Sequence, residues 1–227
     1  MKKYYFITLF FSISLLINPY TASALIIYDS YGIGNDLENG VFNFGRAESG
    51  VDRDVGFQFI PDTSVYLDQI TVSIVLQDDR SNYRDVVLWL MADDNGKPGS
   101  IIESLYFNSP DGPAFFPSYN FPLTTLYSAK RPLLSQGMPY YLIASDNFET
   151  NTPPLNTLFA WEIEDTEFPR IHPIILRNFS DRPWTEPLNS QFVPQARIIG
   201  SPVPEPATLA LFGTGLLGTF FRRKKFV

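Results

Sequence analysis

The chain has 227 residues, of which 44% are apolar, 15% aromatic and 18% charged, so it can form one packed domain and is not wholly disordered. It contains no cysteine, which excludes disulfides, zinc thiolate sites and thiol nucleophiles. Residues 25–203 carry 11 basic and 23 acidic side chains, a net charge of −12. This charge argues against nucleic acid as a partner, because phosphate binding needs basic patches.

The first 24 residues have the three parts of a secretory signal peptide. Lys2 and Lys3 form a positive start, residues 4–17 are almost entirely apolar, and Ala22-Ser23-Ala24 gives the small-x-small pattern that signal peptidase cleaves. We expect cleavage after Ala24 and export of the rest of the chain through the inner membrane. The alternative is an uncleaved membrane anchor.

Short strands are predicted along most of the following body. Apolar and polar residues alternate over 55–59 and 72–76, as in half-buried strands, whereas 85–91 is apolar on both faces, as in a central strand. The run of turn-forming residues over 93–99 predicts a hairpin that leads into a strand at 101–107. Further strands are predicted at 139–144, 158–163, 172–177 and 191–199.

This pattern predicts an all-β fold with a single β-sandwich, jelly-roll-like, over residues 25–200. No helical apolar stripe is present in the body, and many short strands separated by Pro- and Gly-rich turns are typical of a sandwich. Two segments, 108–127 and 146–156, are predicted to be loops or irregular edge strands.

The body offers few residues for catalysis. His172 is the only histidine, and no nucleophile elbow accompanies it, so a Ser-His-Asp triad is not expected. Four acidic residues (Glu162, Glu164, Asp165 and Glu167) cluster beside Trp161, and two carboxylates are all that glycoside hydrolysis requires. The alternation places Glu162 on a wet outer face of a sandwich strand, and we therefore predict no catalytic residues.

Two kinds of binding site remain open. Asp93, Asp94 and Asn95 are candidate calcium ligands, because calcium takes oxygen ligands, but Asp and Asn also favour turns without any metal. Tyr119, Tyr127 and Trp184 are candidate glycan contacts, provided that they are exposed rather than part of the core. The prediction is a protein without a cofactor, with calcium as the alternative.

The C-terminal 27 residues, 201–227, form a three-part tail. Pro204-Glu205-Pro206 is followed by a largely apolar segment, 207–221, and by the basic cluster Arg222, Arg223, Lys224 and Lys225. We expect 207–221 to be a transmembrane helix whose basic end stays in the cytoplasm. The plain alternative is a C-terminal membrane anchor.

This tail resembles the PEP-CTERM sorting signal of Gram-negative bacteria. The resemblance implies that an exosortase, an intramembrane transpeptidase, recognises the tail and processes the chain near the Pro-Glu-Pro motif. It also implies only a transient stay in the inner membrane and a host that makes exopolysaccharide.

The body resembles the choice-of-anchor R domains, which are β-sandwich modules often found in front of PEP-CTERM tails. Gly96-Lys97-Pro98-Gly99 between two strands, the segment 134–142 and Trp161 carry this resemblance. The chain departs from the pattern at Tyr140-Tyr141, where the family usually has an aromatic pair that ends in Trp.

The sequence therefore predicts a non-enzymatic protein of the outer surface or extracellular matrix. The alternatives are a carbohydrate-binding module for exopolysaccharide and a secreted glycan-active enzyme. Exposed aromatic side chains in one patch would favour the first alternative, and two carboxylates facing each other across a cleft would favour the second.

Overall fold

A computed structural model describes residues 23–31, 41–46, 52–77, 85–110, 121–146, 157–165, 172–178, 183–185, 188–190 and 192–203. These residues form an all-β fold. Its strands are β1 (Leu25–Asp29), β2 (Val41–Arg46), β3 (Asp52–Phe59), β4 (Val65–Val72), β5 (Ile74–Leu76), β6 (Asp85–Asp93), β7 (Pro98–Asn108), β8 (Thr124–Tyr127), β9 (Leu133–Leu134), β10 (Tyr140–Ser145), β11 (Thr157–Asp165), β12 (His172–Asn178), β13 (Leu188–Ser190), β14 (Phe192–Pro194) and β15 (Ala196–Pro202).

The two expected targeting segments cannot be compared with this structure. Within the ranges given above, no helix is long and apolar enough to cross a membrane. Residues 1–22 and the expected transmembrane segment 207–221 lie outside those ranges.

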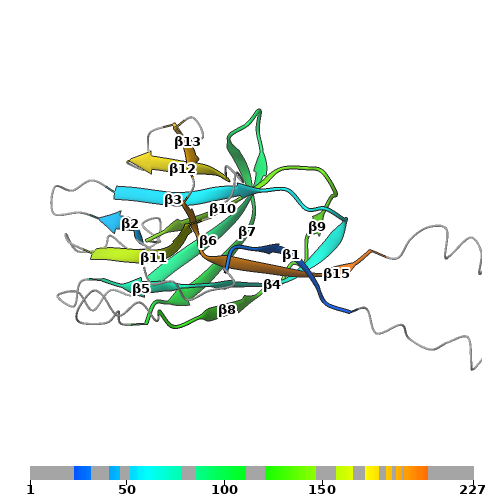
Figure 1. Cartoon of the computed structure of the whole chain (residues 1–227), viewed down its shortest axis with the longest axis horizontal. Coiled ribbons are helices and arrows are strands. Elements are labelled where there is room, and N and C mark those ends of the chain that lie inside the picture. The colour runs from blue at the N-terminus through cyan, green and yellow to red at the C-terminus, as the bar shows by residue number, and fades with distance from the viewer. Residues whose placement is uncertain are drawn as a thin grey trace, which may run out of the picture.

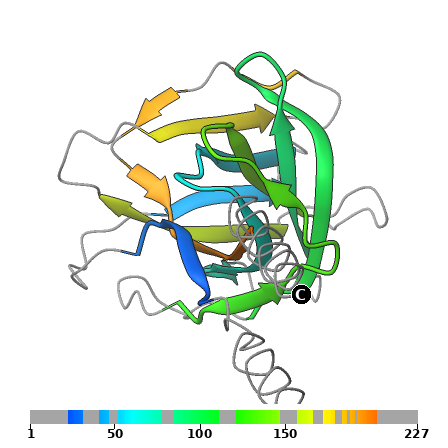
Figure 2. The same cartoon turned by 90° about the vertical axis from the view of Figure 1, so that its right-hand side faces the viewer.

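The strands form two curled sheets, and the paired strands of the described residues run antiparallel (Figure 1). The smaller sheet has the order β1-β15-β4-β8, with β9 also beside β4. The larger sheet has the order β14-β11-β2-β3-β10-β6-β7, and β5, β12 and β13 attach to its side. Figure 2 shows how the strands curl around a common interior. The predicted all-β, sandwich-like fold is confirmed, whereas the jelly-roll connectivity stays a prediction.

Aromatic side chains from both sheets fill the interior. On β3 the alternation seen in the sequence is realised, because Val55, Phe57 and Phe59 are all at most 3% exposed. The ring of Tyr28, from β1 of the smaller sheet, stacks on Phe57 at 4.8 Å between centroids. Trp161 also contacts Phe57, with the two ring centroids 5.9 Å apart in an edge-on arrangement. These contacts join the two sheets through one apolar core.

The larger sheet is covered on both faces along β6 and β10. Val87, Trp89 and Met91 of β6 form a second buried cluster with Ile143 and Ile175, on the face opposite the main core. The residues between them, such as Leu88, belong to the main core. The prediction of a central strand at 85–91 is therefore confirmed, since β6 lies between β10 and β7.

Two predicted strands are wrong in one respect, because each is interrupted by one residue and the parts on its two sides lie in different sheets. The segment 72–76 breaks at Ser73, and 191–199 breaks at Gln195. β4 and β15 belong to the smaller sheet, whereas β5 and β14 pair with β11 of the larger sheet. The two breaks meet at Glu162, whose backbone N–H donates to Ser73 O and whose carbonyl accepts from Gln195 N. Strands that change sheets commonly make such corners.

Several other strands lie in segments where the sequence predicted none or a loop, among them the short strands β9 and β13. β1, β2 and the first half of β4 had no clear alternation, and β8 occupies the end of the expected loop 108–127. Residues 111–120 and 147–156, which contain most of the two expected loops, lie outside the described ranges. The segments that carry the resemblance to choice-of-anchor R domains fall in the β6–β7 turn, from β9 into β10, and in β11. That resemblance stays a prediction.

Candidate functional site

The point where the C-terminal tail leaves the body is fixed by a central strand. β15 lies between β1 and β4, and its last residue, Pro202, still pairs with Val65 of β4. The N–H of Val203 then donates to Ser64 O at 3.4 Å. Pro204 is the next residue in the chain, so the Pro-Glu-Pro motif begins directly after this backbone contact, the last one among the described residues. The motif itself lies outside the described residues.

A polar group that we call the exit clamp holds the end of β15 in place. It consists of Asp68, Arg131 and Ser201. Arg131 Nη2 donates to Asp68 Oδ1 at 2.7 Å and to Ser201 Oγ at 2.6 Å, and Ser201 Oγ donates to Asp68 Oδ2 at 2.6 Å. Because the Arg131 side chain is 56% exposed, we expect its ion pair with Asp68 to stabilise the fold by only about 0–1 kcal/mol. The clamp mainly fixes the direction of the last strand.

The predicted site of N-terminal cleavage lies at the same end of the body. Leu25, which would be the first residue after cleavage, pairs with Gly200 of β15. Ala24 is exposed, as a protease site requires, and Ala22 lies outside the described residues. The described residues that flank the two expected processing points therefore pair directly, although Pro204 follows Ala24 by 180 positions in the sequence.

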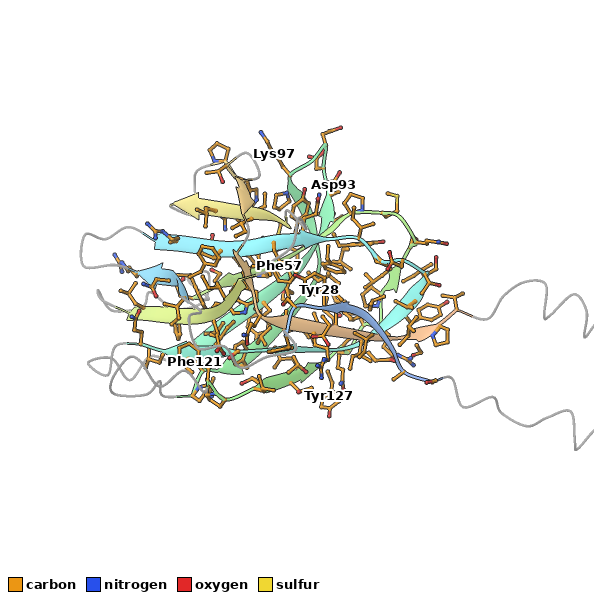
Figure 3. All side chains as sticks on the ribbon, in the orientation of Figure 1. Tyr28, Phe57, Asp93, Lys97, Phe121 and Tyr127 are labelled. Atoms are coloured by element: carbon orange, nitrogen blue, oxygen red, sulfur yellow. The ribbon has the colours of Figure 1, made fainter. Side chains whose placement is uncertain are left out.

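The candidate calcium ligands form the tip of the β6–β7 hairpin (Figure 3). Asp93 is already engaged, because its Oδ1 accepts from the N–H of Gly96 at 3.1 Å and from the hydroxyl of Tyr141 at 3.0 Å. Asn95 has a φ of 56° and donates through Nδ2 to Asp94 Oδ1 at 2.9 Å. Among the described residues, no three His, Cys, Asp or Glu side chains gather as metal ligands would. The geometry is that of a self-bonded turn.

The three candidate glycan contacts do not form one described patch. Tyr127 on β8 is 74% exposed and points away from the body (Figure 3). Trp184 is half-buried, packs against the second apolar cluster, and has the Arg177 guanidinium over its ring at 4.3 Å. Tyr119 lies outside the described residues. Of the three candidates, Tyr127 is the one that the structure shows to be largely exposed.

The prediction that the side chain of Glu162 faces solvent is wrong. Its side chain is only 8% exposed, because β11 is covered on both faces and Glu162 sits at the corner where two strands change sheets. Ser73 Oγ donates to Glu162 Oε2 at 2.7 Å. Burial raises the pKa of Glu162, and the hydrogen bond from Ser73 opposes this shift only in part. The neighbouring Trp161 Nε1 donates to Gln195 O at 2.8 Å, which closes the same corner.

Glu162 is therefore a structural carboxyl group rather than one half of an exposed pair. The side chains of Glu164 and Asp165, and all of Glu167, lie outside the described parts of the chain. The same holds for the side chain of His172, whose backbone pairs with Ser190 at the start of β12. Of the four acidic residues beside Trp161, Glu162 is therefore the one whose side chain the structure describes.

Comparison with known protein families gives a match at the tail. The family described as PEP-CTERM protein-sorting motif matches residues 202–225, about a tenth of the chain. The match begins at Pro202, the last residue of β15, and includes Pro204, Glu205 and Pro206. No curated protein matches the chain. The chain thus carries a PEP-CTERM protein-sorting motif, which implies an exported protein whose membrane-anchored precursor is processed by an exosortase.

Proposed function

We propose that this protein is a non-enzymatic component of the outer surface or extracellular matrix, delivered as an acidic β-sandwich and processed at both ends. The observation that carries the proposal is the sorting motif at residues 202–225, which continues without a linker from the central strand β15. In this account signal peptidase cleaves after Ala24, the segment 207–221 holds the precursor transiently in the inner membrane, and the basic cluster Arg222–Lys225 stays in the cytoplasm.

A processing experiment tests this proposal. The precursor, with an epitope inserted after Val227, is produced in cells with and without an active exosortase. We expect the epitope to be lost from the mature protein only where the enzyme is active, and Pro204→Ala with Pro206→Ala to prevent the loss. Pro122→Ala is the matched control, because Pro122 is exposed and lies outside the sorting motif at residues 202–225. Retention of the epitope in both strains would mean that the tail is only an anchor.

A second function, binding of exopolysaccharide, is supported by a single feature. Tyr127 exposes 74% of its surface on the edge strand β8, and exposed aromatic rings can stack on sugars. The test is a titration of the protein with the host's own polysaccharide. Saturable binding that Tyr127→Ala abolishes, and Tyr106→Ala on β7 leaves unchanged, would establish a lectin-like role. Tyr106 is 60% exposed and serves as the matched aromatic control.

A further inference from the structure

Exposed apolar side chains gather at the end of the body from which the sorting motif leaves. We call this group the apolar rim and define it as Ile60, Tyr66, Leu133 and Met138, which are 52%, 39%, 47% and 53% exposed. All four lie at the start of β4, in the short strand β9 or in the turns that flank them. Large exposed apolar groups that lie together commonly mark an interaction surface.

Backbone contacts place the members of the rim beside one another and beside the exit. Tyr66 pairs directly with Leu133 on one side and with Ser201 of β15 on the other. The turn that contains Met138 is tied to the turn after Ile60, because the N–H of Gly137 donates to Pro61 O at 2.9 Å. Figure 1 shows β9, the start of β4 and the end of β15 on the same side of the molecule.

The length of chain beyond β15 decides what lies opposite the rim. Only residues 203–206 separate Pro202 from the apolar segment 207–221 of the motif. Four residues reach at most about 14 Å when fully extended. The headgroup layer on one side of a bilayer is roughly 5–8 Å thick. The anchored precursor therefore cannot lift its rim far above the membrane surface.

The charges near the rim favour apolar contact over attraction to anionic lipid. The guanidinium of Arg131 is paired with Asp68 in the exit clamp, and the exposed ammonium of Lys130 donates to Ile102 O. Asp62 adds an exposed carboxylate to the turn between β3 and β4. The body as a whole has a net charge of −12 over residues 25–203. Electrostatic binding of acidic headgroups would require the opposite sign.

We propose that the apolar rim enters the interfacial layer of the bilayer that holds the precursor, so that the body docks on the membrane before it is released. This inference rests on the proposed function, since it requires the tail to be in the membrane. Docking would fix the direction in which the Pro-Glu-Pro motif is presented. It would end when the tail is processed, because the rim alone is small and carries no basic charge.

Single cysteine labels test the docking, because the natural chain contains no cysteine. The full-length precursor with Met138→Cys is labelled with a fluorophore and reconstituted into phosphatidylcholine vesicles that contain a headgroup-level nitroxide quencher. Leu123→Cys is the matched control, because Leu123 is 60% exposed and precedes Thr124, which pairs with Val72 at the far end of β4. We expect strong quenching at position 138 and little at position 123.

A second set of variants tests whether apolar contact holds the rim. Ile60→Glu and Leu133→Glu in the Met138→Cys protein are expected to reduce the quenching, whereas Leu123→Glu leaves it unchanged. All three positions are exposed, so circular dichroism should show an intact fold. Replacing part of the phosphatidylcholine by phosphatidylglycerol should not increase the quenching, because the rim offers no unpaired basic group among its described residues.

The remaining outcomes separate the docking proposal from the proposed function. Equal quenching at both positions, or none at position 138 in precursor that co-floats with vesicles, would overturn the docking proposal and leave the sorting function intact. Quenching at position 138 that requires exosortase in the same bilayer would identify the enzyme rather than the lipid as the partner, and would also overturn it. Precursor that does not co-float with vesicles at all would contradict the proposed function itself.

Discussion

Replacing Gly200 by alanine should loosen the strand that delivers the sorting motif. A Cβ at this position would lie 2.6 Å from Tyr66 O, 2.9 Å from Val65 Cγ2 and 3.0 Å from Val65 Cβ. The register between β15 and β4 also shifts between Ile199 and Gly200, which is where a glycine permits two backbones to approach closely. An ordinary contact needs roughly 3.5 Å, so β15 and β4 must separate by about 1 Å.

The separation should have a measurable cost because the nearest atom belongs to the backbone of β4 and cannot rotate away. Overpacking of this kind costs about 1–3 kcal/mol of unfolding free energy. For a domain of this size, a loss of 2 kcal/mol corresponds to a fall in Tm of about 4–8 °C. Thermal and urea unfolding of the wild-type protein and Gly200→Ala measure this difference.

Gly137→Asn provides the matched control. Gly137 has a φ of 73°, and a Cβ there meets no atom within 4 Å, so an asparagine, which tolerates this backbone conformation, should change stability little. Equal stability of Gly200→Ala and the wild-type protein would refute the close approach of β15 to β4. A fall as large in Gly137→Asn would show that glycine substitution alone, rather than the contact with Tyr66, explains the effect.

Three further predictions concern the interior and the hairpin. At a pH above the raised pKa of Glu162, Glu162→Gln should have a larger free energy of unfolding than the wild-type protein, because the folded wild-type protein favours the neutral carboxyl. In acid the two proteins should become equally stable. Stability curves that stay parallel over the whole pH range would contradict this. Trp161→Phe should lose about 1–3 kcal/mol in urea unfolding, since it leaves the buried Gln195 O without its donor; an unchanged midpoint would refute that role. The protein should have the same Tm with calcium and with EDTA, because Asp93 already accepts hydrogen bonds from Gly96 and Tyr141. A higher Tm with calcium would show that the hairpin binds the ion.

Alternation in the sequence predicted the strands that bury one face or both. Val55, Phe57 and Phe59 alternate and are buried together, and 86–91 is apolar throughout because β6 has a core on each side. The sequence could not separate 72–76 or 191–199 into two strands, since Ser73 and Gln195 also fit the polar positions of a continuous strand. The change of sheet depends on their long-range hydrogen bonds to Glu162.

The burial of Glu162 shows the same limit. An acidic residue between Trp161 and Ile163 fits the outer face of a half-buried strand, and nothing local indicates that a second layer covers it. The exit clamp was likewise not predictable, because Asp68, Arg131 and Ser201 come from three distant segments. The sorting motif was predictable because its three parts are contiguous in the sequence, and the matched family confirms it.

The mass of the mature protein in its own cells tests the central claim most directly. The unprocessed chain has a mass of 25.8 kDa. We predict a smaller protein that begins at Leu25 and ends near Pro204-Glu205-Pro206 in cells with an active exosortase, and one that still contains residues 207–227 in cells that lack the enzyme. The same C-terminus in both cells, with 207–227 retained, would contradict the account of a protein sorted and processed through its tail.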